Sequence, residues 1–189
     1  LRLNVIDENV KGLENAILAV DLLLQADRDL FQALVAERSM IFSKPKSDEF
    51  RGLAKSHKEN IKQARERAEK FYTVIRDTEI ERMFTIYVKH RNQWEALTKK
   101  IRLEREADTR AGRRAAIEMS FGSSSEQFNQ MREQIDHMVA YIEALSHQSV
   151  EETTGSVSST QGTVVTLLIL SLIVGAGISY LFPKIIVGH

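Results

Sequence analysis

The sequence predicts an all-α protein, an antiparallel up-down-up-down four-helix bundle followed by a transmembrane helix. Three observations predict this class. Apolar residues recur at steps of three and four over long stretches, the 189 residues include only two prolines and nine glycines, and the twenty residues 163–182 carry no charge. This composition suits one helical domain ahead of a single apolar segment.

The first helix is expected from about Asn4 to Phe42. It should stop at the sequence Ser43, Lys44, Pro45, because proline disfavours helical geometry in the residue before it. The apolar stripe expected to face the core consists of Leu13, Ile17, Val20, Leu24, Leu30, Leu34 and Ile41.

The next two helices follow from a cap and from their apolar spacing. Ser47 is expected to cap the second helix, which places charges on its solvent side and should end near Asp77 or Thr78. The third helix should begin near Ile80 and continue to about Met119.

The clearest turn in the second half is Phe121–Ser125, and Ser124 or Ser125 can cap a fourth helix beyond it. Apolar residues then repeat in steps of three or four from Phe128 to Leu145. In such a bundle the start of the first helix and the end of the fourth lie at the same end, next to the membrane. The serine- and threonine-rich stretch 149–162 either continues the fourth helix or forms a tether, and both interpretations stay open.

The uncharged stretch 163–182 is long enough to cross a bilayer, since about 1.5 Å per residue gives about 30 Å. The predicted organisation is a bundle over 1–161, a transmembrane helix over 162–182 and the start of a linker over 183–189. Acidic residues precede the membrane segment and Lys184 follows it, which favours a cytoplasmic C-terminal side. Because the amphipathic pattern starts at once at Leu1, we expect an earlier membrane helix to precede it.

Two stretches resemble the four-helix-bundle ligand-binding domain of bacterial methyl-accepting chemotaxis proteins. They are Asp21–Met40, DLLLQADRDLFQALVAERSM, and Ala115–Ile135, AAIEMSFGSSSEQFNQMREQI, which is similar to that family's turn into its fourth helix. The apolar segment ending in Phe182, Pro183 and Lys184 is similar to the family's second membrane helix, which leads into a HAMP linker. The resemblance covers nearly the whole chain, but not a first membrane helix, a complete HAMP domain or the cytoplasmic hairpin.

The resemblance implies a homodimeric chemoreceptor sensor module in the bacterial inner membrane, with its sensor domain in the periplasm. Its ligand would be a small molecule, for which a carboxylate is suitable, or a periplasmic binding partner. Signalling would occur through displacement of the fourth helix and the membrane helix. In this family ligands generally lie between the first and fourth helices, which implies the ligand-binding residues Arg28, Arg38, Asp27, Gln32 and Phe128.

The residues themselves give a physical reason to examine this region. Asp27 falls on the apolar stripe of the first helix, where an unpaired charge is destabilising, and arginine offers two parallel donors to a carboxylate. An alternative stays open, in which Asp27 and Arg28 form an internal salt bridge or fix the register of a helical seam. His57 is expected to be a satisfied core or boundary histidine, because no metal-ligand spacing accompanies it.

Composition and motifs exclude several other classes of function. The formal charge is zero, from 26 basic and 26 acidic residues, so the overall basic field typical of nucleic-acid binding is absent. There is no cysteine, and we find no phosphate loop, nucleophile elbow or HExxH sequence, so we expect no enzyme, cofactor or metal. Two alternatives remain, the outer domain of a sensor histidine kinase and a tail-anchored structural or assembly protein.

Overall fold

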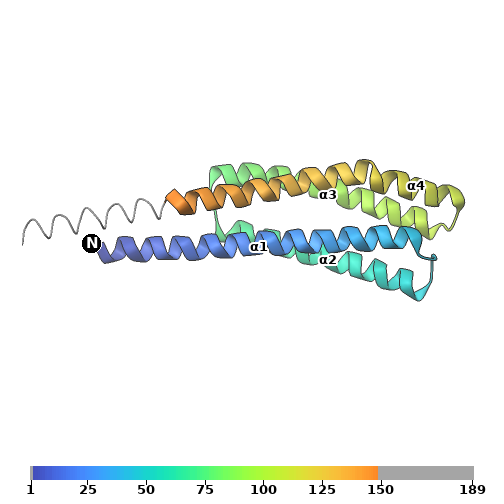
Figure 1. Cartoon of the computed structure of the whole chain (residues 1–189), viewed down its shortest axis with the longest axis horizontal. Coiled ribbons are helices and arrows are strands. Elements are labelled where there is room, and N and C mark those ends of the chain that lie inside the picture. The colour runs from blue at the N-terminus through green and yellow to red at the C-terminus, as the bar shows by residue number, and fades with distance from the viewer. Residues whose placement is uncertain (1, 149–189) are drawn as a thin grey trace, which may run out of the picture. The chain divides into compact units, whose positions relative to one another are not determined.

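The computed structural model describes residues 2–148 of the chain. No strand occurs within that range, so the all-α prediction is confirmed there. The helices are α1 (Arg2–Phe42), α2 (Asp48–Val74), α3 (Thr78–Glu106), α4 (Arg110–Phe121) and a further helix over 123–148 (Figure 1).

Residues 10–146 form one compact unit. Its main core contains buried apolar side chains from α1, α2, α3 and the helix over 123–148. A smaller cluster joins Ile41, Ile101 and Ala116, from α1, α3 and α4. The second unit comprises residues 1–9 and 147–189, of which the structure describes the start of α1 and residues 147 and 148.

The predicted boundary between the first two helices is confirmed. α1 ends at Phe42, three residues before Pro45, and α2 begins after Ser47. The Ser47 side chain accepts a hydrogen bond of 3.1 Å from the backbone N–H of Phe50, which satisfies one of the free donors at a helix start.

The end of α2 comes earlier than predicted. The helix stops at Val74, and Asp77 is the N-cap of α3 rather than the end of α2. The Asp77 carboxylate accepts hydrogen bonds from the backbone N–H groups of Glu79 (2.8 Å) and Ile80 (3.3 Å). These contacts hold the pKa of Asp77 below its usual value, because they favour the charged form.

The prediction of an uninterrupted third helix to Met119 is wrong. α3 ends at Glu106, and Asp108 follows with a left-handed backbone angle φ of 53°. The Thr109 side chain then accepts a hydrogen bond of 2.9 Å from the backbone N–H of Gly112 and caps α4. The chain thus leaves helical geometry at residues that also occur inside helices, so composition alone did not indicate the break.

The predicted turn over Phe121–Ser125 is confirmed only at Gly122, and the helix beyond it begins at residue 123, before the predicted caps Ser124 and Ser125. The interruption there is limited to Gly122, whose N–H donates to the carbonyl of Glu118 (3.0 Å) and whose carbonyl accepts from the N–H of Glu126 (3.1 Å). Figure 1 shows α4 leading directly into the helix over 123–148. The change of direction lies instead between α3 and α4.

The predicted core stripe of α1 is partly wrong. Leu30, Leu34 and Ile41 are buried, but Leu13, Ile17 and Leu24 are exposed. The core face of α1 is richer in alanine than predicted and includes Ala16, Ala19, Leu23, Ala26, Leu30 and Ala33. Because α1 carries apolar residues on more than one face, its periodicity does not reveal which face is buried.

Within residues 2–148, no helix has the length and apolar character needed to cross a membrane. The predicted transmembrane helix over 162–182, the linker over 183–189 and the stretch 149–162 lie outside the described residues.

Candidate functional site

One turn of α1, residues 27–29, connects α1 to two other helices, and we call it the charged turn. Asp27 pairs with Arg132 of the helix over 123–148. Asp29, whose side chain is 1% exposed, pairs with Arg67 of α2. Arg28 lies between them with 57% of its side chain exposed, and within residues 2–148 its hydrogen-bonding partner is Asp29, at 3.3 Å. The charged turn therefore joins three helices and leaves one arginine accessible.

The Asp27–Arg132 pair has two hydrogen bonds, Nε to Oδ1 at 2.5 Å and Nη2 to Oδ2 at 3.0 Å. The Arg132 guanidinium also lies 4.2 Å from the centre of the Phe31 ring. Hydrogen bonding to Asp27 raises the pKa of Arg132, because it favours the charged guanidinium. Two parallel charge-assisted bonds fix orientation as well as distance, which makes this pair a specific link between α1 and the helix over 123–148.

Aromatic side chains pack beside this link. Phe31 meets Phe128 edge to face with ring centroids 5.4 Å apart, and Phe128 meets Trp94 of α3 at 5.3 Å. Phe128 and Trp94 are buried, whereas Phe31 is partly accessible. The ion pair thus lies at the edge of the core, where it is only partly screened by water.

A groove of about 520 Å³ lies between α1 and α2. Arg28 and Gln32 line it from α1, and Asn60 lines it from α2, where its amide donates to the hydroxyl of Ser56 (3.2 Å). The other lining residues, Phe31, Val35, Ala36 and Leu53, are apolar. Apolar walls with a few polar groups are typical of small-molecule sites.

The predicted ligand-binding residues do not form one site. Arg28 and Gln32 meet in the groove between α1 and α2, whereas Asp27 and Phe128 lie at the contact between α1 and the helix over 123–148. Arg38 lies apart from both, and its guanidinium stacks 4.7 Å from the centre of the Phe121 ring. Of the five predicted residues, Asp27 and Phe128 therefore lie at the expected contact between the first and last helices.

The alternative salt bridge between Asp27 and Arg28 does not form. Asp27 does form an internal salt bridge, but with Arg132, and Arg28 contacts Asp29 instead. Adjacent residues on a helix point in different directions, so Asp27 and Arg28 reach different neighbours.

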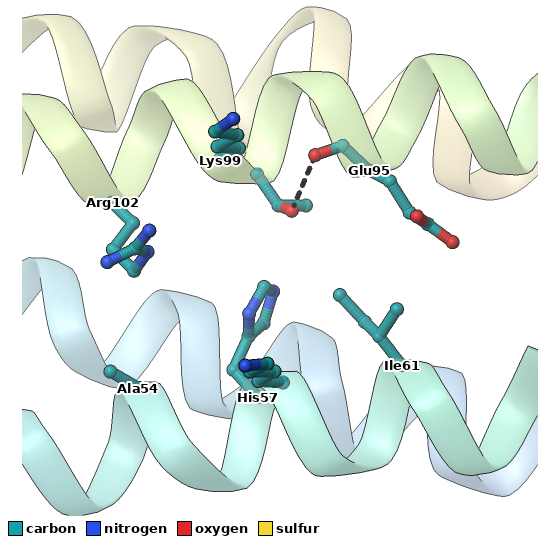
Figure 2. Close-up of a pocket in the computed structure, with 8 residues that line it drawn as sticks. Ala54, His57, Ile61, Glu95, Lys99 and Arg102 are labelled. Atoms are coloured by element: carbon teal, nitrogen blue, oxygen red, sulfur yellow. Dashed lines mark hydrogen bonds between the residues drawn. The ribbon is translucent and has the colours of Figure 1, made fainter.

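A second pocket, of about 330 Å³, lies between α2 and α3 (Figure 2), and we call it the α2–α3 pocket. Figure 2 shows the ring of His57 pointing from α2 toward α3, and Arg102 reaching from α3 toward α2. Lys58 and Lys99 line the same space. This pocket was not predicted from the sequence. The available signal was positive charge, since Lys99 and Arg102 lie one turn apart and Lys58 follows His57.

Positive charge predominates in the α2–α3 pocket. Arg102 pairs with Glu106 at 2.6 Å, but Lys58 and Lys99 have no ion-pair partner among residues 2–148. The acid in the lining, Glu95, is paired with Arg65 at 2.5 Å, outside the pocket.

His57 is not the satisfied histidine that was expected. It is 6% exposed, and its Nε2 has no hydrogen-bond partner among the described residues. Burial, together with a smaller effect of the nearby charge of Arg102, lowers the pKa of His57 to about 4. The imidazole is therefore neutral in the empty pocket at neutral pH.

A buried carboxyl lies apart from both sites. Glu37 of α1 is fully buried, accepts a hydrogen bond of 2.6 Å from the Ser120 hydroxyl and has no partner for Oε2 among the described residues. Burial raises the pKa of Glu37 to about 7, although the bond from Ser120 and the charge of Arg38 oppose that rise. Among the described residues, no group of three acidic, histidine or cysteine side chains could hold a metal ion.

No family model, no curated protein and no solved structure matches this chain, so the case for its function rests on the residues and contacts described above.

Proposed function

We propose that this chain is the sensor module of a transmembrane chemoreceptor, which binds a small carboxylate and passes the signal to a membrane helix over 162–182. In this proposal the helices form an antiparallel up-down-up-down bundle, and α4 together with the helix over 123–148 supplies the fourth rod. The bundle would lie in the periplasm of a bacterial cell, anchored in the inner membrane. The uncharged stretch 163–182 and the resemblance to chemotaxis receptors support this proposal.

The observation that carries the proposal is the adjacency of Arg28 and Asp27. Arg28 lines the groove between α1 and α2, and Asp27 binds Arg132 of the helix over 123–148. Both belong to one turn, so a ligand that moves or reorients Arg28 acts on the backbone that holds Asp27. Ligand binding and helix displacement are thereby linked through a single turn of α1.

The groove favours a carboxylate with an apolar body. The accessible guanidinium of Arg28 can donate two parallel hydrogen bonds to a carboxylate, and its present contact with Asp29, at 3.3 Å, is long for such a bond. Gln32 and Asn60 provide further polar contacts, while the apolar walls accept the rest of the ligand.

The signal would pass through the Asp27–Arg132 pair, which would be formed in one state of the receptor and broken in the other. Its two-bond geometry holds only for a narrow range of relative positions of α1 and the helix over 123–148. A shift of the last helix along its axis would exchange this pairing for another, and the chain continues from that helix toward the apolar segment.

A second copy of the chain would pack along α1. Exposed apolar residues repeat along this helix at intervals of seven and four, which is typical of a helical seam. These residues are Ile17, Leu24, Phe31, Val35 and Phe42. A homodimer would remove them from water, and because Phe31 and Val35 also line the groove, the ligand would lie beside the dimer interface.

The ligand part of the proposal can be tested by a thermal-shift screen of the full chain in a nonionic detergent against small carboxylates. A ligand that binds the folded state raises the apparent stability. We expect the rise to be lost in Arg28→Ala and kept in Arg51→Ala, which removes an exposed arginine of α2 outside the groove. No rise with any carboxylate, or an equal rise in Arg28→Ala, would contradict the groove as the ligand site.

Transmission requires a separate measurement. Because the chain has no cysteine, nitroxide labels can be attached at Leu24→Cys on α1 and Asp136→Cys on the helix over 123–148, which are both exposed. A stabilising carboxylate should change the distance between the labels. An unchanged distance at saturating ligand would rule out displacement of the last helix.

A further inference from the structure

We infer that the α2–α3 pocket is a second binding site, for a small molecule that carries a dianionic phosphate group. The pocket shares no residue with the groove between α1 and α2. A failure of the proposed carboxylate site would therefore leave this second site unaffected, and the reverse also holds.

The first argument is the pattern of ion pairs on α2. Lys55 and Lys62 pair with acids one turn further on, at 3.8 Å from Glu59 and 3.6 Å from Glu66. Lys58 lies between them, lines the pocket and has no such partner among the described residues. Position 62, one turn after Lys58, is itself a lysine, so α2 supplies no acid to Lys58 and its charge stays available to an anion.

The second argument is that cationic residues of two helices line the pocket, Lys99 and Arg102 from α3 and Lys58 from α2. Figure 2 shows the Arg102 side chain reaching from α3 toward α2. Arg102 uses one nitrogen, Nη1, for Glu106, and its other nitrogens have no protein partner within residues 2–148. An anion bound in the pocket would be attracted by all three charges.

The acid in the lining does not cancel this charge. Glu95 binds Arg65 at 2.5 Å, and Arg91 lies 3.6 Å away on its other side. Figure 2 shows the Glu95 carboxylate directed away from Arg102, while its backbone carbonyl accepts from the hydroxyl of Thr98. The centre of the pocket is therefore left to the cations.

His57 supplies the third argument. Its side chain is buried between the two helices, and Nε2 lacks a hydrogen-bond partner among the described residues. An unpaired buried polar atom is destabilising, and a phosphate oxygen would provide the missing partner. A neutral imidazole that carries its proton on Nε2 can donate this hydrogen bond to the phosphate.

The size of the pocket indicates an organic phosphate rather than the bare ion. Its volume of about 330 Å³ lies near the lower end of the range for small-molecule sites, roughly 300–1,000 Å³. Ala54 and Ile61 form apolar parts of the lining. A phosphate monoester can place its charge among the cations and its carbon skeleton against these side chains.

The test is calorimetric titration of the full chain in nonionic detergent with glycerol phosphate and with inorganic phosphate. Both are dianions at about pH 8, and chloride keeps the ionic strength constant. We expect glycerol phosphate to bind, and the double variant Lys58→Gln/Lys99→Gln to weaken its Kd at least about tenfold. The matched variant Lys55→Gln/Lys100→Gln removes the same charge from the same helices and should change Kd by less than about twofold.

Comparison of the two ligands identifies the source of the phosphate. Weaker binding of inorganic phosphate supports an organic ligand, and equal binding supports recognition of the phosphate group alone. Ala54→Leu narrows the pocket without a change of charge and should weaken glycerol phosphate binding. The inference is overturned if neither ligand binds at about 10 mM, or if both double variants lose affinity equally while circular dichroism shows them folded.

Discussion

The charged turn and the α2–α3 pocket use charge in opposite ways. In the charged turn each carboxylate has an arginine partner, Asp27 with Arg132 and Asp29 with Arg67. In the pocket Lys58 and Lys99 have no acidic partner among the described residues. The first arrangement uses its electrostatic attraction within the fold, where it fixes the register of three helices. The second leaves attraction available to a ligand and lowers the stability of the empty protein.

Glu37 is a third case, because its carboxyl group is buried and has no ion-pair partner among the described residues. Ser120 gives it one hydrogen bond, and its second carboxylate oxygen has none among the described residues. The three regions therefore form a series: a paired charge, an unpaired charge near solvent and an unpaired charge in the core. Substitutions at each should change stability with different sign and size.

The largest effect is expected at Glu37. Its pKa is raised from 4.5 to about 7, so the native state holds the proton more tightly than the unfolded chain. The associated stability is present below about pH 4.5 and is lost as the pH rises through about 7. Glu37→Gln, which mimics the protonated form, should be more stable than the parent by up to about 3 kcal/mol at pH 8 and nearly equal at pH 4. Urea unfolding of the full chain at both pH values measures this.

Glu133→Gln, at an exposed position of the helix over 123–148, is the control for the Glu37 substitution. It should show no comparable gain between the two pH values. An equal effect of Glu37→Gln at pH 4 and at pH 8 would show that the carboxyl does not titrate with the fold.

The next effect is expected from breaking the Asp27–Arg132 pair. Arg132→Met keeps the stem over Phe31 but leaves Asp27 without its partner in a partly buried position. We expect a loss of about 2 kcal/mol in the free energy of unfolding, less than for a fully buried pair because both side chains retain some solvent. Urea unfolding of the full chain tests this.

A double-mutant cycle separates the pair from its surroundings. Asp27→Asn in the Arg132→Met background should recover part of the loss, with a coupling of about 1 kcal/mol or more. Arg114→Met removes one side of the exposed Arg114–Glu118 pair and should change the unfolding midpoint little. A coupling near zero between residues 27 and 132 would remove the basis for the proposed transmission.

Local signals made the boundary between α1 and α2 predictable. Ser47 and Pro45 act on their immediate neighbours, so the end of α1 and the start of α2 could be read from the sequence. The break between α3 and α4 was missed, although Thr109 is a residue type that favours helix starts and Asp108 is one that tolerates left-handed geometry. The change of direction was therefore predicted at Gly122, whereas it occurs at Asp108 and Thr109.

The sites were harder to predict because they depend on how helices are rotated. Asp27 was noticeable as a charge on an apolar helix, but nothing local identified Arg132, 105 residues away, as its partner. The cations of the α2–α3 pocket look like ordinary solvated charges until α2 and α3 are placed together. Hydrophobic periodicity identifies a helix, whereas the buried face of α1 and the side-chain partners depend on the helix packing itself.

A smaller effect is expected on the titration of His57. The groups that face it are Lys58 on α2 and Glu95, Lys99 and Arg102 on α3. Sulfate is a useful probe here, because it stays doubly charged where phosphate gains a proton. A bound dianion should raise the pKa of His57 from about 4 by about one unit or more. The bound state then holds more protons than the free state, so sulfate affinity should increase as the pH falls toward 4.

Nuclear magnetic resonance of the histidine Cε1–H groups, with and without sulfate, measures this shift directly. The Lys58→Gln/Lys99→Gln variant should remove it, since sulfate then loses its main attraction. An unchanged His57 titration at saturating sulfate would mean that the imidazole does not face the anion.

The smallest effect is expected on the free energy of unfolding when the pocket lysines are replaced in the protein without ligand. Lys58→Gln/Lys99→Gln removes two unpaired like charges, so it should raise the free energy of unfolding by roughly 0.5 kcal/mol or less, opposite in sign to Arg132→Met. The gain should disappear at about 1 M salt, where screening already suppresses the repulsion. Lys55→Gln breaks a pair with Glu59 and should give no gain at either salt concentration. A site kept ready for an anion is destabilising while it is empty, so a loss of stability in the pocket variant would show that its lysines serve the fold rather than a ligand.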